Sequence, residues 1–293
     1  MKALPGTKTL LMGDAGTGKT YAIKSAVDWC KANGNRQVFC LFTEQGLETL
    51  IGAYTDFNQP IPDNLHWHVL DMKPIKLSSL MKTAENAGKM SYEAMTKMVD
   101  ATRHETNVFL EILSILSDFP DDRTGQKFGA VDAWDNSRHL FIDGLTQLSN
   151  AAMKMIVGSK PTASQPDYGV AQNNLMNLLN LLTQATECHV GLLAHCMRER
   201  DETSGTIKLM PSAVGVALSP QIPPLFSDCI FTVREGDKWY WDTINTQAVV
   251  KTRSLQVAAR ILPNFSAIYD KWLKREAASR TMNSAAVQTA STT

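Results

Sequence analysis

The sequence contains no apolar run close to the roughly 20 residues that a membrane-spanning helix requires, so we expect no membrane association. Its formal net charge is zero, which excludes a uniformly basic coat for nucleic acid but is compatible with a local basic patch. None of its five cysteines stands at C-x-x-C spacing, so a zinc site is not expected. The odd cysteine count and the lack of a secretory leader favour reduced thiols and a cytoplasmic location.

What the chain does contain, close to its start, is a glycine-rich pattern of the type G-x-x-x-x-G-K-[ST]. It consists of Gly13, Asp14, Ala15, Gly16, Thr17, Gly18, Lys19 and Thr20. The apolar run over residues 9–12 predicts a buried strand before the loop, and apolar residues at helical spacing predict a helix after it. In this context backbone N–H groups bind phosphate, Lys19 reaches the β- and γ-phosphates, and the Thr20 hydroxyl binds Mg²⁺. The pattern therefore predicts a site for a nucleoside triphosphate.

Two acidic residues follow predicted buried strands. Glu44 follows the strand predicted over residues 37–42, and Asp143 ends the apolar run that begins at residue 138. Ligands of open α/β sheets bind at the carboxyl ends of the strands, so both side chains are expected beside the phosphate loop. We assign Asp143 to the magnesium ion. Because Gly144 stands where a glutamate could follow Asp143, we assign the catalytic acid to Glu44, the alternative being a helix N-terminal acid.

Histidines stand at two other informative places. His195 ends a strand predicted over residues 189–194, where it either senses the γ-phosphate or merely terminates the strand. His66 and His68 alternate with Trp67 in a further predicted strand, so their imidazoles share one face. We expect these two imidazoles to face solvent rather than to form a metal-binding pair.

Charge is distributed unevenly along the chain. Between residues 100 and 135 there are eight acids and three bases, a balance that should repel a nucleic-acid backbone. Between residues 234 and 280 there are nine bases and five acids, and Arg198, Arg200 and Lys208 precede them in a long stretch without a core pattern. This basic half is the predicted contact surface for a nucleic-acid phosphate backbone, the alternative being a solvated basic face.

The later part of the chain is predicted to form short strands over residues 229–234, 238–242 and 246–251. Lys251 and Arg253 alternate at the end of the third, so both side chains should leave the same face. Two parallel cations suit an anion placed between them, such as a nucleotide bound to a neighbouring subunit. The alternative is an exposed edge strand that charge protects from aggregation.

These motifs resemble, in their order, the RecA-like branch of the P-loop ATPases. The resemblance rests on the phosphate loop, Glu44, Asp143, His195 and the Lys251-x-Arg253 pair, and it covers roughly residues 8–255. Within this branch the chain is similar to phage-encoded AAA/RecA-type nucleotide-binding proteins of the single-strand annealing and recombination group. Residues 194–201 with 210–211, and then residues 250–253, carry this narrower resemblance.

The resemblance implies an α/β fold with a mostly parallel central sheet, flanking helices and C-terminal antiparallel strands. Residues 1–280 would form a single RecA-like ATPase domain, and residues 281–293 a disordered tail. A predicted helical insertion at about residues 76–135 is longer than a minimal core of this type needs, and the resemblance gives it no role.

The resemblance also implies an activity: Mg²⁺-dependent ATP hydrolysis acting on single-stranded DNA in phage recombination or replication. Glu44 would polarise the attacking water, His195 would sense the γ-phosphate, and Lys251 with Arg253 would reach a neighbour's nucleotide. The expected partners are further copies in a homo-oligomeric ring or filament and a phage single-strand binding protein, in the host cytoplasm. Two other functions remain open, namely a nucleotide kinase with residues 197–224 as its lid, and an ATPase for virion assembly or packaging.

Overall fold

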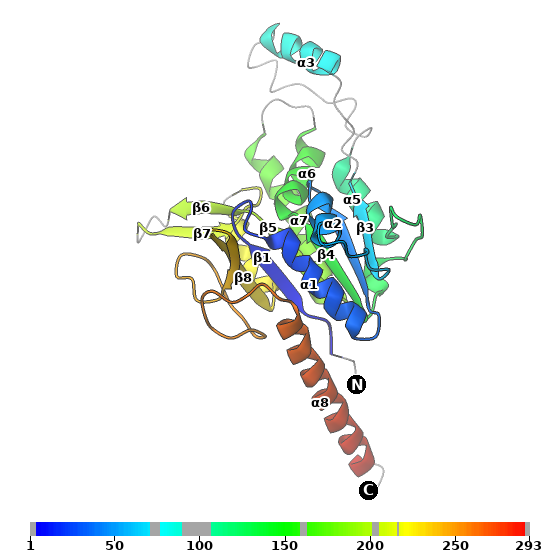
Figure 1. Ribbon diagram of the computed structural model, residues 1–293. Coiled ribbons are helices and arrows are strands. Elements are labelled where there is room, and N and C mark those ends of the chain that lie inside the picture. The colour runs from blue at the N-terminus through cyan, green and yellow to red at the C-terminus, as the bar shows by residue number, and fades with distance from the viewer. Residues whose placement is uncertain are drawn as a thin grey trace.

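The computed structural model describes residues 4–70, 77–89, 107–158, 163–200, 205–215 and 217–290 (Figure 1). The strands are β1 Lys8–Met12, β2 Gln37–Phe42, β3 Leu65–Val69, β4 Arg138–Asp143, β5 His189–Ala194, β6 Cys196–Arg200, β7 Ile207–Pro211, β8 Asp228–Glu235 and β9 Lys238–Asp242. The helices are α1 Lys19–Ala32, α2 Leu47–Thr55, α3 Leu77–Lys89, α5 Val108–Ser117, α6 Leu145–Val157, α7 Gln165–Asn180 and α8 Ser266–Ala290. Short helical turns cover Val131–Ala133, Leu181–Ala185, Ser219–Gln221 and Pro223–Leu225.

Seven strands form the central sheet, in the order β3-β2-β4-β5-β1-β8-β9. All neighbouring strands are parallel except β8 and β9, which form an antiparallel hairpin at one edge. The predicted α/β fold with a mostly parallel sheet and C-terminal antiparallel strands is confirmed. Because β5 lies between β1 and β4, the residues that follow β2, β4, β5 and β1 stand in that order along the carboxyl edge of the sheet.

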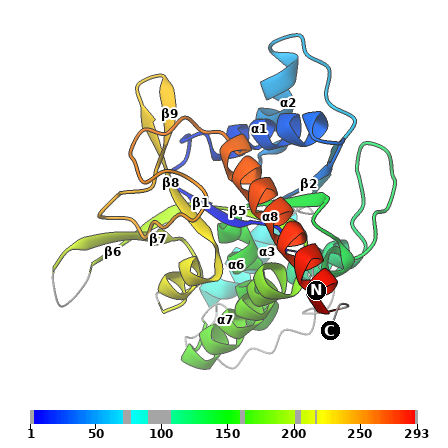
Figure 2. The same cartoon turned by 90° about the horizontal axis from the view of Figure 1, so that it is seen from below.

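Helices cover both faces of the sheet, as Figure 2 shows with α1 and α2 above it and α6 and α7 below it. The alternation of β1 explains the two layers, because successive strand residues point to opposite faces. Leu10 and Met12 pack in the core beneath α5, α6 and α7, whereas Leu11 packs with α1, α2 and the start of α8. The sheet is therefore buried on both sides, which explains its near-continuous apolar strands.

The C-terminal part of the chain departs from the prediction in two places. The expected strand over residues 246–251 is absent, since the described residues there form only single bridges, Leu209 to Ala248 and Cys229 to Lys251. Helix α8 continues to Ala290, past residue 281, where we expected an irregular tail. Residues 281–290 contain neither glycine nor proline, the two residues that most strongly interrupt a helix.

The stretch at residues 76–135 is helical in part, with α3 and α5 as its described helices. The predicted helical residues 92–106 lie outside the described part. After α5, residues 118–129 fold back along β3 and cover it. This cover overturns the prediction that His66 faces solvent: its ring is buried, with Nδ1 3.0 Å from Asp121 Oδ2 and Nε2 2.7 Å from Gln37 Oε1.

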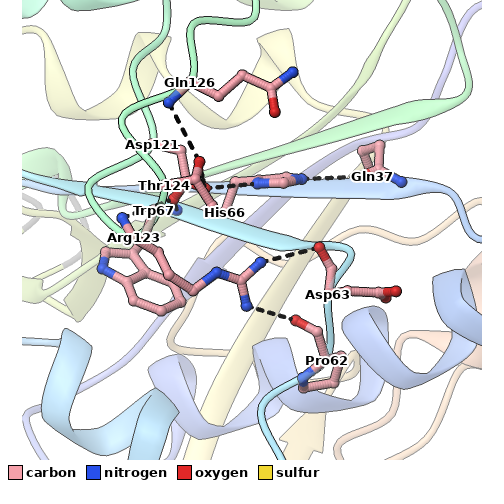
Figure 3. Close-up of polar contacts among 9 residues, drawn as sticks. All are labelled: Gln37, Pro62, Asp63, His66, Trp67, Asp121, Arg123, Thr124 and Gln126. Carbon is pink, nitrogen blue, oxygen red and sulfur yellow. Dashed lines mark hydrogen bonds and ion pairs between the residues drawn. The ribbon is translucent and has the colours of Figure 1, made fainter.

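Carboxylates close the edge of the sheet along β3, and Figure 3 shows the first of them, Asp121, beside His66 and Trp67. Asp121 Oδ1 accepts a hydrogen bond from Trp67 N, and Asp122 accepts from Val69 N and lies 2.6 Å from His68 Nδ1. Free N–H groups on an edge strand invite pairing with other chains, and these carboxylates occupy them. Both histidines therefore serve to dock the covering segment, and within the described residues no group of three or more His, Cys, Asp or Glu side chains could hold a metal.

No helix in the described ranges combines the length and the hydropathy needed to cross a membrane.

Candidate nucleotide site

Most of the phosphate loop meets Glu44, Asp143 and His195 in one pocket at the carboxyl edge of the sheet. The pocket has a volume of about 260 Å³. Its lining consists of Ala15, Gly16, Thr17, Gly18, Lys19, Thr20, Tyr21, Glu44, Gln45, Thr49, Asp143 and His195. Four separate strand ends supply these side chains, and this edge is where parallel α/β sheets bind ligands.

The phosphate loop links β1 to α1 and is built on left-handed glycines. Gly16 and Gly18 have φ angles of 75° and 80°, which side chains other than glycine rarely adopt. Lys19 is buried, and its Nζ donates to the carbonyl oxygens of Gly13 and Asp14, both at 2.8 Å. Burial lowers the pKa of Lys19, and the charge of Asp143 opposes that shift. The ammonium group is thus held inside the loop by neutral acceptors that phosphate oxygens can replace.

Thr20 and Asp143 form the part of the pocket suited to a cation. Thr20 Oγ1 donates to Asp143 Oδ2 at 2.6 Å. Burial raises the pKa of Asp143, and the hydrogen bond from Thr20 counters this. Gly46 leaves the space beside this carboxylate open, because a Cβ there would come within 2.7 Å of Asp143 Oδ2. Hydroxyl and carboxylate oxygens are ligands that Mg²⁺ prefers, so the residues present fit this ion.

Glu44 and His195 meet across the end of β4. Glu44 Oε2 lies 3.0 Å from His195 Nε2, whereas the buried Oε1 has no hydrogen-bond partner. Gly144 makes room for this carboxylate, because a Cβ at Gly144 would lie 3.1 Å from Glu44 Oε1. Thr43 fixes the same turn, since its hydroxyl bonds the Gly144 N–H at 2.8 Å and the Gly144 carbonyl at 3.0 Å. The lack of a side chain at Gly144 therefore leaves free the space that the Glu44 carboxylate occupies.

Lys251 and Arg253 do not join this group, since neither lines the pocket. Lys251 is bridged to Cys229, and its Nζ donates to Pro224 O at 3.1 Å. Arg253 has an exposed side chain, and its backbone N–H donates to Asp228, which pairs with the first half of β1. Lys251 and Arg253 thus lie near the amino end of β8, whereas the pocket lies at the carboxyl ends of the strands. Their action on a neighbouring subunit stays a prediction.

The β8–β9 hairpin contributes contacts that the sequence did not reveal. Trp239 Nε1 donates to Gly16 O at 3.1 Å, and Thr232 Oγ1 lies 2.7 Å from Thr17 Oγ1. More than 200 residues separate each of these pairs along the chain, so no local motif points to them.

The match to a protein-family model agrees with this geometry. A family model described as an AAA domain matches residues 6–254, which spans every strand of the central sheet. No curated protein matches the sequence. A solved structure, titled as a prototypical ATPase from the type III secretion system of pathogenic bacteria, is 14% identical with a TM-score of 0.36. The alignment covers 78% of this chain and 53% of that one, so this chain spans about half of that protein's length. The family match and the phosphate loop together establish that the chain belongs to the AAA domain family and is a P-loop ATPase.

Proposed function

We propose that the protein is a RecA-like, Mg²⁺-dependent ATPase that acts on single-stranded DNA in phage recombination or replication. The observation that carries the DNA-directed part is the position of His195. This residue contacts Glu44 and is followed at once by β6, the first arm of the β6–β7 hairpin. A ligand that moves the hairpin would therefore act on the predicted catalytic acid through one side chain.

The phosphate loop, Glu44, Asp143 and His195 have separate tasks in the proposed hydrolysis. The N–H groups of the phosphate loop and Lys19 bind the phosphates, while Thr20 and Asp143 would hold the ion. Mg²⁺, when bound, neutralises charge that develops on the β- and γ-phosphates. The Glu44 carboxylate orients the attacking water, while His195 Nε2 lies 3.0 Å from its Oε2. Catalysis of this type relies on positioning and charge stabilisation.

The β6–β7 hairpin has the charge and exposure expected of a DNA contact. It lies apart from the central sheet as a two-stranded element, at the left of Figure 1. Arg198 and Arg200 alternate on β6, so their exposed side chains share one face. Ile207 on the paired strand is 53% exposed, and an apolar side chain beside cations suits the bases and phosphates of a single strand.

The test compares ATP turnover with and without single-stranded DNA, in the wild type and in a protein with Arg198, Arg200 and Lys208 changed to glutamine. The proposal expects DNA to stimulate the wild type and expects the variant to keep basal turnover while binding DNA more weakly. Its DNA affinity should also depend less steeply on salt. Lys31→Gln with Lys127→Gln is the matched control, because these exposed cations lie on other elements.

The same experiment separates the two alternative functions. Transfer of phosphate to a nucleoside monophosphate would indicate a nucleotide kinase, although the described residues of the expected lid, 197–224, form a hairpin and short turns. A rate of ATP turnover that does not change with DNA, together with copurification of capsid components, would indicate a role in virion assembly or packaging. DNA binding unaffected by the triple substitution would overturn the hairpin placement.

We further propose that the active form is a homo-oligomeric ring or filament, with a phage single-strand binding protein as a second partner. The exposed Arg253 supports the oligomer, because its side chain can act on another copy's nucleotide but does not line its own pocket. The mass of the protein with and without ATP, measured in solution, tests this point.

A further inference from the structure

The β8–β9 hairpin packs along the outer side of the phosphate loop. Trp239 on β9 donates its indole N–H to Gly16 O, and Thr232 on β8 contacts Thr17 Oγ1 at 2.7 Å and Met12 O at 3.3 Å. The hairpin therefore bonds the residue that precedes the loop, Met12, and two residues in the middle of the loop, Gly16 and Thr17. Thr232 and Trp239 both lie outside the phosphate-binding motif.

Steric contacts show how closely the two segments fit. A Cβ at Gly13 would lie 2.1 Å from Thr232 Oγ1 and 2.6 Å from Thr232 O. A Cβ at Gly18 would lie 2.8 Å from Trp239 Cγ, and neither backbone nor an indole ring can yield by that much at low cost. Two glycines of the motif are thus required by the hairpin as well as by the backbone geometry of the loop.

The bond to Gly16 has a direct consequence for phosphate binding. The peptide unit is planar and trans, so the Gly16 carbonyl and the Thr17 N–H point in opposite directions. By holding Gly16 O on the outer side, Trp239 turns the Thr17 N–H toward the interior of the loop. A phosphate loop works by converging its N–H groups on one anion, and their like partial charges oppose that arrangement in the absence of ligand. An external donor to Gly16 O offsets this cost before the nucleotide arrives.

We propose that Trp239 is a positioning residue that holds the phosphate loop in its anion-binding shape from outside, with Thr232 as its partner on β8. Trp239 does not line the pocket, and its indole N–H is already committed to Gly16 O. Its ring centroid lies 5.1 Å from that of Tyr21, which does line the pocket. The indole therefore acts on the nucleotide through the loop and not by direct contact.

The test measures affinity for Mg-ATP and for inorganic tripolyphosphate, beside kcat and KM, in the wild type and in Trp239→Phe. This substitution keeps an aromatic ring and removes the N–H donor. Affinity for both ligands should fall by the same factor, about threefold to tenfold for one hydrogen bond, while kcat at saturation changes little. Tyr240→Phe is the matched control, because its side chain leaves the opposite side of β9 and should change neither affinity.

Thr232→Val provides a second variant that preserves side-chain shape, in case Trp239→Phe does not fold. It removes the contact with Thr17 and should weaken ATP and tripolyphosphate binding equally. Weaker binding of ATP alone would show that Trp239 contacts the base or sugar, and would overturn the proposal. Unchanged affinity for both ligands in both variants would show that the hairpin only packs against the loop, and would also overturn the proposal. Since neither measurement involves DNA, the outcome is independent of the proposed DNA-directed function.

Discussion

His195 Nε2 lies 3.0 Å from Glu44 Oε2, so the side chains that follow β5 and β2 meet across the end of β4. The contact leaves Glu44 Oε1 without a partner while fixing the other oxygen. Because β6 begins at Cys196, directly after His195, the contact also connects the phosphate pocket to the start of the β6–β7 hairpin.

The first prediction concerns this acid. Glu44→Gln should preserve ATP affinity and reduce turnover by roughly 100-fold or more, the usual scale for a positioned acid–base group. Glutamine has nearly the same shape and can still bond His195, so the pocket geometry is retained while the charge that orients water is lost. Single-turnover hydrolysis and nucleotide titration measure the two effects separately. If turnover barely changes, the water is activated elsewhere, and Asp14 and Glu48 become the residues to examine.

The second prediction concerns Lys19. Lys19→Ala should abolish ATP turnover, because the side chain supplies the cation for the β- and γ-phosphates. The fold should persist, and the thermal midpoint should not fall much, since the buried ammonium has a lowered pKa and gains little from its neutral partners. Circular dichroism and ATPase assays check both parts, with the exposed Lys31→Ala as control. Turnover like that of the wild type would contradict the nucleotide site itself.

The third prediction tests the expected trans role of Arg253. Its guanidinium is exposed, whereas the Lys251 ammonium is tied to Pro224 of the same chain, so Arg253 is the better candidate to reach a neighbour. Inactive Arg253→Ala protein mixed with inactive Lys19→Ala protein should regain activity. Some interfaces would then combine an intact loop from one mutant with an intact arginine from the other.

The mixing experiment needs two controls. Co-assembly of the two mutants must be demonstrated by mass, since separate oligomers would remain inactive for trivial reasons. Mixed oligomers without activity would count against a trans role, and undiminished turnover of Arg253→Ala alone would remove it.

The fourth prediction concerns pH and the buried histidines at the other end of the strands. His139 and His189 stack with ring centroids 4.1 Å apart, and both nitrogens of His139 lack hydrogen-bond partners. Burial lowers the pKa of His139 to about 3, and burial together with the neighbouring His139 lowers that of His189. Protons therefore bind more readily to the unfolded chain, whose histidines titrate near pH 6.5.

The direction in which stability changes with pH follows from this difference in pKa. The stability that depends on neutral His139 is complete above about pH 6.5 and is lost as the pH falls toward about 3. For His139 alone the loss between pH 7 and pH 5 is about 2 kcal/mol. His139→Phe should flatten this acid limb, and urea unfolding at several pH values measures it. An unchanged slope in the variant would show that other groups control the acid transition.

Much of the nucleotide site was predictable because its information is local. The phosphate loop is contiguous, and apolar runs before Glu44, Asp143 and His195 identified buried strands. Parallel strands then bring their carboxyl ends to one edge by geometry, so these residues were expected to be neighbours before any contact was known.

The burial of His66 was not predictable in the same way. Alternation in β3 gives the face of the sheet on which a side chain lies, but not what covers that face. Asp121, more than 50 residues away, turns a strand position that reads as solvent-facing into a buried hydrogen-bonded one. The contact depends on where residues 118–129 return, which local periodicity does not encode.

The sequence by itself therefore determined the class of the fold, the phosphate loop and the edge of the sheet on which the acids stand, because strand pattern and loop chemistry are short-range properties. Only the tertiary structure decided that Glu44 meets His195, that Trp239 and Thr232 hold the loop from outside, and that Arg253 lies away from its own pocket. The first two relationships follow from the strand order β2-β4-β5-β1-β8-β9, and the third from the bonds that fix the chain after Lys251 to Asp228. That order is set by packing between segments far apart in the chain, and no pattern within one segment specifies its neighbour.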